Sequence, residues 1–182
     1  MEGLIEKWIA RVADAASAGR SLAIRGGGSK VFYGSPEQGE VLEVGDYQGI
    51  VAYEPTELVV TARGGTPLRD LAAALAEKGQ WLPFEPPHFG PAATAGGMLA
   101  AGLSGPRRQA VGALRDYVLG VKILNGSGEV LSFGGQVMKN VAGYDVARLM
   151  AGSLGTLGLV LEVSLKVFPL PVAETSPRLA ID

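Results

Sequence analysis

The stretch AIRGGGSK, residues 23–30, places three consecutive glycines between a short apolar segment and a lysine. Ordering a glycine costs up to about 1 kcal/mol more than ordering an alanine, because its backbone has more freedom to lose. Successive glycine amides can turn inward and form a concave, non-helical site for an anion. Arg25 and Lys30 flank the loop with positive charge, and Ser29 adds a hydroxyl donor. The stretch therefore predicts either a phosphate-binding loop or a tight turn after a strand.

This loop differs from the two common phosphate-binding motifs. In a Walker A loop a serine or threonine follows the lysine, whereas here Ser29 precedes Lys30. A dinucleotide-binding fingerprint has a third glycine where this chain has Val31, and it opens a helix. Residues 29–39 are a poor helix sequence, so any anion site here is a loop of backbone amides.

A second stretch, GPAATAGGMLAAGLSGPRR at residues 90–108, is rich in small residues. Such residues allow a flat ligand to approach the backbone, with Thr94 and Ser104 as hydrogen-bond partners for its polar edge. Met98 and Leu99 are then expected to pack on its apolar face. The alternative is close packing of a helix through glycine and alanine.

The composition narrows the classes of function. The 182 residues include 27 glycines, and glycine clusters at residues 25–28, 64–65, 96–105 and 152–158. The net charge of −2 gives no basic field for nucleic acid, and the absence of cysteine excludes disulfides and thiolate chemistry. With His88 as the one histidine, no metal site is expected. No apolar run has the roughly 18 residues of a membrane span, and residues 1–10 are unlike a secretory signal, so we expect a cytoplasmic protein.

The pattern of apolar residues predicts an α+β fold with a mixed sheet. Helices are expected at 2–19, at 68–75 with Thr66 as cap, and at 144–152 with Asp145 as cap. Strands are expected at 21–24, at 40–44 and 48–53 around a turn, at 57–62, and at 157–168. A hairpin is expected for 117–124 and 129–133 around residues 125–128. Residues 81–106 show no regular pattern, and long loops of this kind are usually functional or disordered.

Three stretches carry a family resemblance: RGGGSK (25–30), PPHFGPAATAGGMLAAGLSGPRR (86–108), and the segment 115–169 that includes VMKNVAGYD (137–145). Together they resemble the FAD-binding domain of the vanillyl-alcohol oxidase (PCMH-type) flavoprotein family. SGPRR and VMKNVAGYD are the most specific pieces, and they match the glycolate oxidase branch. The resemblance covers about residues 20–169.

The resemblance implies FAD bound in an extended form between two α+β lobes, residues 1–56 and 57–182. It assigns the pyrophosphate loop to Ile24, Arg25, Gly26, Gly27, Gly28, Ser29 and Lys30. It places along the ribityl chain and flavin ring His88, Phe89, Gly90, Pro91, Thr94, Gly96 and Gly97, followed by Ala101, Gly102, Leu103 and Ser104. At the adenosine end it places Leu154, Gly155, Thr156, Leu157, Gly158, Leu159 and Val160.

The sequence departs from the family in two respects. Relatives carry a substrate-covering cap domain, and after Leu170 only PVAETSPRLAID follows here, so an incomplete active site is expected. Some relatives attach flavin through histidine or cysteine, whereas here the loop has Ser29 and Lys30, so FAD is expected to bind non-covalently. His88 is expected to be a turn or surface residue, and Arg107 and Arg108 a solvated pair.

Three functions remain open from the sequence. In the first, the chain is an FAD-binding subunit for oxidation of a small hydroxy acid, glycolate, to glyoxylate. The resemblance then implies a second flavoprotein subunit and an iron–sulfur subunit as partners, with membrane association only through them. In the second, the chain is a non-catalytic assembly module, and in the third a small stand-alone flavin reductase.

Overall fold

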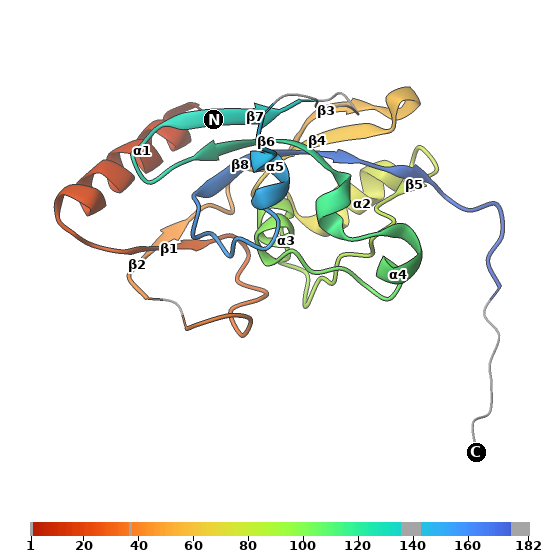
Figure 1. Cartoon of the computed structure of the whole chain (residues 1–182), viewed down its shortest axis with the longest axis horizontal. Helices are drawn as coiled ribbons and strands as arrows, with labels where there is room; N and C mark the ends of the chain where they lie inside the picture. The colour runs from red at the N-terminus through yellow and green to blue at the C-terminus, as the bar shows by residue number, and fades with distance from the viewer. Residues whose placement is uncertain (1, 37, 136–142, 176–182) are drawn as a thin grey trace, which may run out of the picture.

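A five-stranded sheet with the strand order β3-β4-β8-β6-β7 forms the centre of the molecule (Figure 1). The structure is a computed structural model and describes residues 2–36, 38–135 and 143–175. The strands are β3 (Ile50–Glu54), β4 (Val59–Arg63), β6 (Val118–Leu124), β7 (Val130–Gly134) and β8 (Leu159–Lys166). Neighbouring strands in this sheet are all antiparallel. The α+β class is confirmed, but the prediction that this sheet is mixed is wrong.

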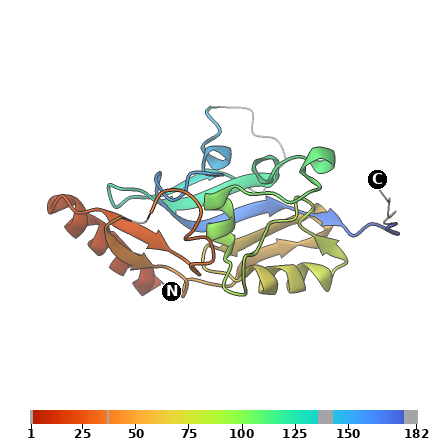
Figure 2. The same ribbon diagram turned by 90° about the horizontal axis from the view of Figure 1, so that it is seen from below.

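The parallel pairing lies in a separate two-stranded sheet. There β1 (Leu22–Arg25) pairs with β2 (Glu40–Glu43), and α1 (Glu2–Ser17) packs beside them (Figure 2). Trp8 of α1 and Leu42 of β2 share an apolar cluster with Leu161 of β8. This cluster fixes the N-terminal elements against one end of the central sheet. Strands β2 and β3, expected around one turn, therefore belong to different sheets.

One large apolar cluster joins the central sheet to the helices α2 (Leu68–Ala76), α3 (Ala95–Ala101) and α5 (Val146–Leu149). In α2 the residues Leu68, Leu71 and Leu75 are buried, at the helical spacing that the sequence predicts. The remaining elements are α4 (Arg108–Val111), the 3-10 turns η1 (Pro55–Glu57) and η2 (Leu114–Tyr117), and the pair β5 (Gln80–Trp81) with β9 (Phe168–Pro169). The hairpin predicted around residues 125–128 is confirmed as β6-β7.

Two local predictions differ from the structure. Residues 81–106 are not without regular structure, because α3 lies within them and the Thr94 hydroxyl caps it, accepting from the Gly97 amide. Thr66 does not cap α2, since its hydroxyl bonds to the backbone N–H and C=O of Gly49 instead. Asp145, as predicted, caps α5 by accepting from the amide of Arg148.

Two further expectations concern the VMKNVAGYD motif and the division into two lobes. Residues 137–142 of the VMKNVAGYD motif lie outside the described residues. The division into lobes at residue 56 stays a prediction, and the pairing of β3 with β4 joins residues from both sides of it.

Helix α3 packs on the sheet at Gly64, which leads to a stability prediction. A Cβ atom on Gly64 would lie 2.2 Å from the carbonyl oxygen of Val160. We expect Gly64→Ala to lower the free energy of unfolding by at least about 2 kcal/mol, because backbone atoms must move apart. Gly126→Ala is the control, since a Cβ there meets nothing within 4 Å. Denaturant unfolding measures both, and equal stability of the two variants would contradict the packing described.

Candidate functional site

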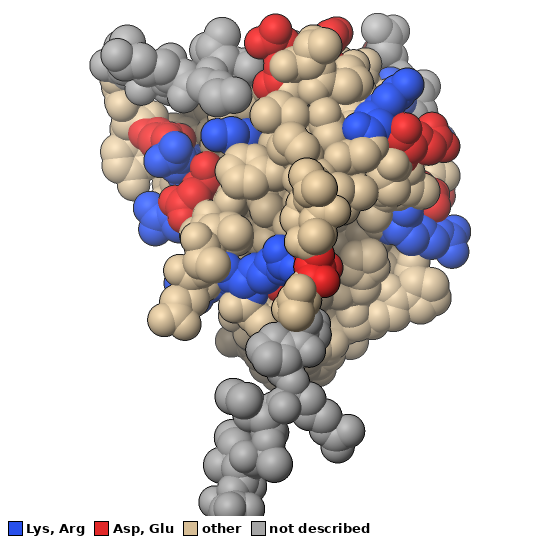
Figure 3. Space-filling view, turned by 90° about the vertical axis from the view of Figure 1, so that its right-hand side faces the viewer, with Lys and Arg blue, Asp and Glu red and all other residues tan. Residues whose placement is uncertain are grey.

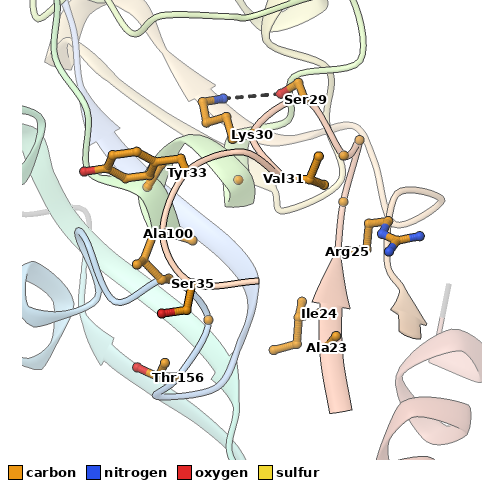
Figure 4. A pocket seen from close by; sticks show the side chains of 18 of the residues that line it. Ala23, Ile24, Arg25, Ser29, Lys30, Val31, Tyr33, Ser35, Ala100 and Thr156 are labelled. Carbon is orange, nitrogen blue, oxygen red and sulfur yellow. Dashed lines mark hydrogen bonds between the residues drawn. The ribbon is translucent and has the colours of Figure 1, made fainter. Parts of the chain in front are cut away.

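A pocket of about 400 Å³ opens between the glycine loop that follows β1 and one side of α3, from its cap Thr94 to its last residue Ala101. Its walls are residues 22–31 and 33–36, the α3 side at Thr94, Gly97, Ala100 and Ala101, and the loop 154–156. In Figure 4 Ile24 points toward Thr156 and Ser35, whereas Arg25 points to the other side of the strand. This is the alternation expected of successive strand residues. The pocket therefore lies between segments that are far apart in the sequence.

Close backbone packing builds the glycine side of this pocket. A Cβ on Gly27 would lie 1.5 Å from the carbonyl oxygen of Ala92, and one on Gly26 would lie 2.7 Å from Thr94 Oγ1. Gly28 has φ +65°, a conformation that residues with a Cβ rarely adopt. The glycines are thus required because the loop touches residues 92–94. The sequence suggested a different reason, namely clearance for a ligand.

The loop presents donors that lack protein acceptors. Among the hydrogen bonds of the described residues, none has the backbone amide of Gly27, Gly28 or Ser29 as donor. Lys30 is half-buried, and its Nζ lies 3.5 Å from Ser29 Oγ (Figure 4). Burial lowers the pKa of the Lys30 ammonium, and no carboxylate of the described residues forms an ion pair with it. A partly desolvated cation beside three free amides suits a bound anion.

Arg25 contributes less directly to this site. Its guanidinium lies 3.6 Å from the carboxylate of Glu43 on β2. This ion pair links β1 to β2. Arg25 also places a positive charge at the end of β1, directly before the glycine loop.

The structure brings about half of the predicted site residues together at this pocket. These are Ile24, Arg25, Gly26, Gly27, Gly28, Ser29, Lys30, Thr94, Gly97, Ala101, Leu154, Gly155 and Thr156. A neighbouring cavity of about 240 Å³, which shares Ile24, Gly155 and Thr156 with the pocket, is lined in addition by Leu157, Gly158 and Leu159. The ligand roles of all these residues stay predictions.

The other predicted residues lie elsewhere. His88, Phe89, Gly90 and Pro91 form an exposed loop, in which the Phe89 ring meets Phe32 edge-on with centroids 5.0 Å apart. Val160 is buried in the sheet core, and Leu103 is half-buried. Gly96, Gly102 and Ser104 have structural contacts: Gly96 donates to the Gly64 carbonyl, Gly102 ends α3, and Ser104 Oγ accepts from Leu114. Their contacts with a ligand stay predictions.

Two residues expected to pack on a ligand ring do not line the pocket. Met98 and Leu99 are buried in the cluster between α3 and the sheet. Residues of the loop VFYGSP (31–36) form a wall instead, notably Val31 and Tyr33, and sequence reasoning missed them. The sequence did contain an indication of this wall, because an uncharged loop with two aromatic residues follows Ser29 and Lys30, just after the glycines.

Other kinds of site find no support in the described part of the chain. The residues at 2–36, 38–135 and 143–175 hold no group of three His, Cys, Asp or Glu side chains placed to bind a metal. Within the same ranges, no helix is both long and apolar enough to cross a membrane.

Comparison with known proteins identifies the fold and its ligand. Residues 5–134 match the family described as FAD binding domain. The chain belongs to this family. The PCMH-type α+β fold expected from the sequence is thereby confirmed, and FAD is the cofactor of the domain.

Relatives of this FAD-binding domain are subunits or enzymes of hydroxy-acid oxidation. The chain is 57% identical to glycolate oxidase subunit GlcE of Escherichia coli over 86% of its own length and 45% of that protein. It is 34% identical to glycolate oxidase subunit GlcD of Bacillus subtilis, over 81% of the chain and 32% of the relative. It is 36% identical to a D-lactate dehydrogenase of Anaerostipes hadrus, over 70% of the chain and 26% of the relative. The chain spans less than half the length of each of these relatives.

The residues present fit FAD. The dinucleotide carries an anionic pyrophosphate, and the glycine loop offers free amides and the uncompensated Lys30. The pocket that begins at this loop extends along α3 to residues 154–156, and the second cavity shares Ile24, Gly155 and Thr156 with it. The two cavities therefore lie side by side, next to the donor-rich loop.

Lys30 supplies the first test of this site. We expect Lys30→Met to stabilise the FAD-free protein, because it removes a charge that burial disfavours. It should also weaken FAD binding about tenfold or more, since charge-assisted hydrogen bonds contribute about 1.5–3 kcal/mol. Lys30→Arg, which keeps the charge, is the control. Thermal unfolding and FAD titration measure the two effects, and parental FAD affinity in Lys30→Met would rule out a phosphate contact.

The pH dependence of stability gives a second test. Because the folded-state pKa of Lys30 lies below the ordinary 10.5, the unfolded chain binds this proton more tightly. The free energy of unfolding without FAD should therefore rise as pH increases from the lowered pKa toward 10.5. Denaturant unfolding across alkaline pH should show this rise in the parent but not in Lys30→Met. Identical pH profiles would contradict it.

The close contact at Gly27 provides a third test. We expect Gly27→Ala to push the loop away from Ala92 and to weaken FAD binding about tenfold, the loss of roughly one charge-assisted bond. Gly3→Ala is the control, because a Cβ there meets nothing within 4 Å. Fluorescence titration with FAD compares them. Unchanged affinity in Gly27→Ala would mean that the loop position does not matter for the cofactor.

Proposed function

We propose that this chain binds FAD non-covalently as one subunit of a complex that oxidises glycolate, or a closely related 2-hydroxy acid, to the 2-oxo acid. The 57% identity with glycolate oxidase subunit GlcE is the observation that carries the proposal. The donor-rich loop at Gly27–Lys30 supports cofactor binding by this chain rather than by a partner alone.

Non-covalent attachment agrees with the side chains near the pocket. The chain has no cysteine, and the glycine loop has Ser29 and Lys30 and no histidine. His88 lies in the exposed loop and is not among the lining residues of the pocket. The cofactor is therefore held by hydrogen bonds, charge and apolar contact.

The chemistry divides between the cofactor and the protein. Bound FAD supplies a hydride acceptor for the carbon that carries the substrate hydroxyl. The amides at Gly27–Ser29 and the Lys30 ammonium hold the phosphates, and α3 with Thr94 forms the opposite wall. These groups would fix the position of the cofactor's phosphates.

The removal of the hydroxyl proton calls for a group outside the described lining. The titratable lining residues within the described part of the chain are Arg25, Lys30 and Tyr33, none of which is a carboxylate or histidine. A cationic lysine that binds phosphate is a poor general base. We propose that a second flavoprotein subunit completes catalysis and that an iron–sulfur subunit carries the electrons onward. The complex is proposed to be cytoplasmic, with membrane association only through these partners.

Reconstitution tests this function. The purified chain, stripped of flavin and titrated with FAD, should bind it in a stoichiometric, reversible manner that denaturation releases. Alone it should not reduce its flavin when glycolate is added, whereas the complex isolated from the native source should bleach the visible flavin absorbance and form glyoxylate. A chain that never takes up FAD would overturn cofactor binding and favour an assembly module. Solo turnover of a nicotinamide would favour a stand-alone reductase.

A further inference from the structure

Arg107 is the centre of an ion-pair cluster beside the segment that leads to the pocket. Its Nε lies 3.2 Å from Glu85 Oε1, and its backbone N–H donates to Glu85 Oε2 at 3.0 Å. Its guanidinium carbon stacks 4.6 Å from the centroid of the Trp81 ring, and it also pairs with Glu174. The expectation that Arg107 is a solvated surface charge is therefore wrong. On the face of the molecule in Figure 3, basic and acidic side chains lie next to one another in this manner.

Glu85 is held in an unfavourable backbone conformation. Its φ is +50°, a left-handed conformation that residues with a Cβ rarely adopt. A second contact holds the neighbouring residue, because the Gly105 amide donates to the Phe84 carbonyl at 2.8 Å. A Cβ on Gly105 would lie 2.7 Å from the Glu85 carbonyl oxygen. Such strain persists only where neighbouring contacts impose it, and Arg107 makes two of them.

The segment that starts at Glu85 ends at the glycine loop. Nine residues further on lies Thr94, whose Oγ1 is the atom nearest a Cβ built on Gly26, and Ala92 lies against Gly27 in the same way. Residues 86–91 between them are mostly exposed and form no helix or strand. Hydrogen bonds from the Leu68 amide to the Ala93 carbonyl and from the Ala95 amide to the Thr66 carbonyl hold the far end of this segment, so Glu85 and Arg107 anchor its near end.

We propose that Arg107 is a positioning residue for the FAD site, acting through Glu85 on residues 86–94 and so on the glycine loop. The inference rests on the proposed binding of FAD by this chain. Arg107 itself is not a lining residue of the pocket, so its effect is transmitted through the backbone of this segment. The planar guanidinium suits the task, because it stacks on Trp81 while its edge faces the Glu85 carboxylate.

Glu174 offers a matched control for the same guanidinium. It pairs with Arg107 from the segment after β9, and its side chain is 56% exposed. Glu174→Gln removes one partner of Arg107 and leaves Glu85 in contact. Comparing Glu174→Gln with Glu85→Gln therefore distinguishes the loss of any carboxylate partner of Arg107 from the specific loss of the Glu85 contact.

The test uses the full chain loaded with FAD and compares Arg107→Gln, Glu85→Gln, the double variant and Glu174→Gln. We expect Arg107→Gln and Glu85→Gln each to speed FAD dissociation about three- to tenfold, the range expected for a partly exposed, hydrogen-bonded ion pair. The double variant should be no faster than the single ones, because they break the same anchor. The visible flavin spectrum should shift in these variants, and Glu174→Gln should match the parent.

Hydrogen exchange on the FAD-free chain keeps the inference separate from the proposed function. The amides of this segment that are not prolines, at residues 88–90 and 92–94, should exchange faster in Arg107→Gln and Glu85→Gln than in the parent, with α1 unchanged. A fall in melting temperature without any change in FAD dissociation, flavin spectrum or exchange in 86–94 would overturn the inference. A parent chain that binds no FAD would overturn the proposed function, while the exchange measurement would still decide whether Arg107 anchors this segment.

Discussion

The site depends on the direct packing of the glycine loop against the backbone of residues 92–94. There is no room for a Cβ between Gly27 and the Ala92 carbonyl, so the two segments are fixed relative to each other. The loop lines the pocket, and among the described residues its amides at Gly27, Gly28 and Ser29 donate to no protein acceptor. The donors are then arranged before any ligand arrives, and the entropy of ordering the glycines is paid during folding.

The same arrangement leaves one cation, Lys30, partly desolvated and without a carboxylate partner among the described residues. Lys30 loses part of its hydration on folding and gains no carboxylate among the described residues. Arg25 avoids this cost by pairing with Glu43 on the adjacent strand. If Lys30 binds phosphate as proposed, the protein gives up some stability at this lysine in exchange for binding, a common pattern where stability and binding compete.

Much of the fold follows from local sequence patterns, and the differences arise where tertiary contacts decide. The helices at α1 and α2 and the β6-β7 hairpin have clear apolar spacing or turn residues, so they were predictable. Helix α3 was not, because alanine and glycine give no amphipathic pattern and its start depends on the Thr94 cap. Thr66 resembled a cap in sequence, but a pairing partner 17 residues away, Gly49, takes its hydroxyl. The glycine loop was recognisable as a candidate site, whereas only the uncharged, aromatic composition of residues 31–36 indicated the wall that they form.

The small residues of helix α3 have two roles: some let the helix pack closely on the sheet, and others line the pocket. Gly96 approaches Gly64 so closely that its amide donates to the Gly64 carbonyl at 2.7 Å, which brings the helix against the sheet. Gly97 and Ala101, from the same short helix, face the pocket. Larger side chains on the sheet side would lift the helix and move Thr94 with it, and Thr94 touches the glycine loop. The same seven-residue helix therefore determines both the close packing on the sheet and the position of Thr94 against the glycine loop.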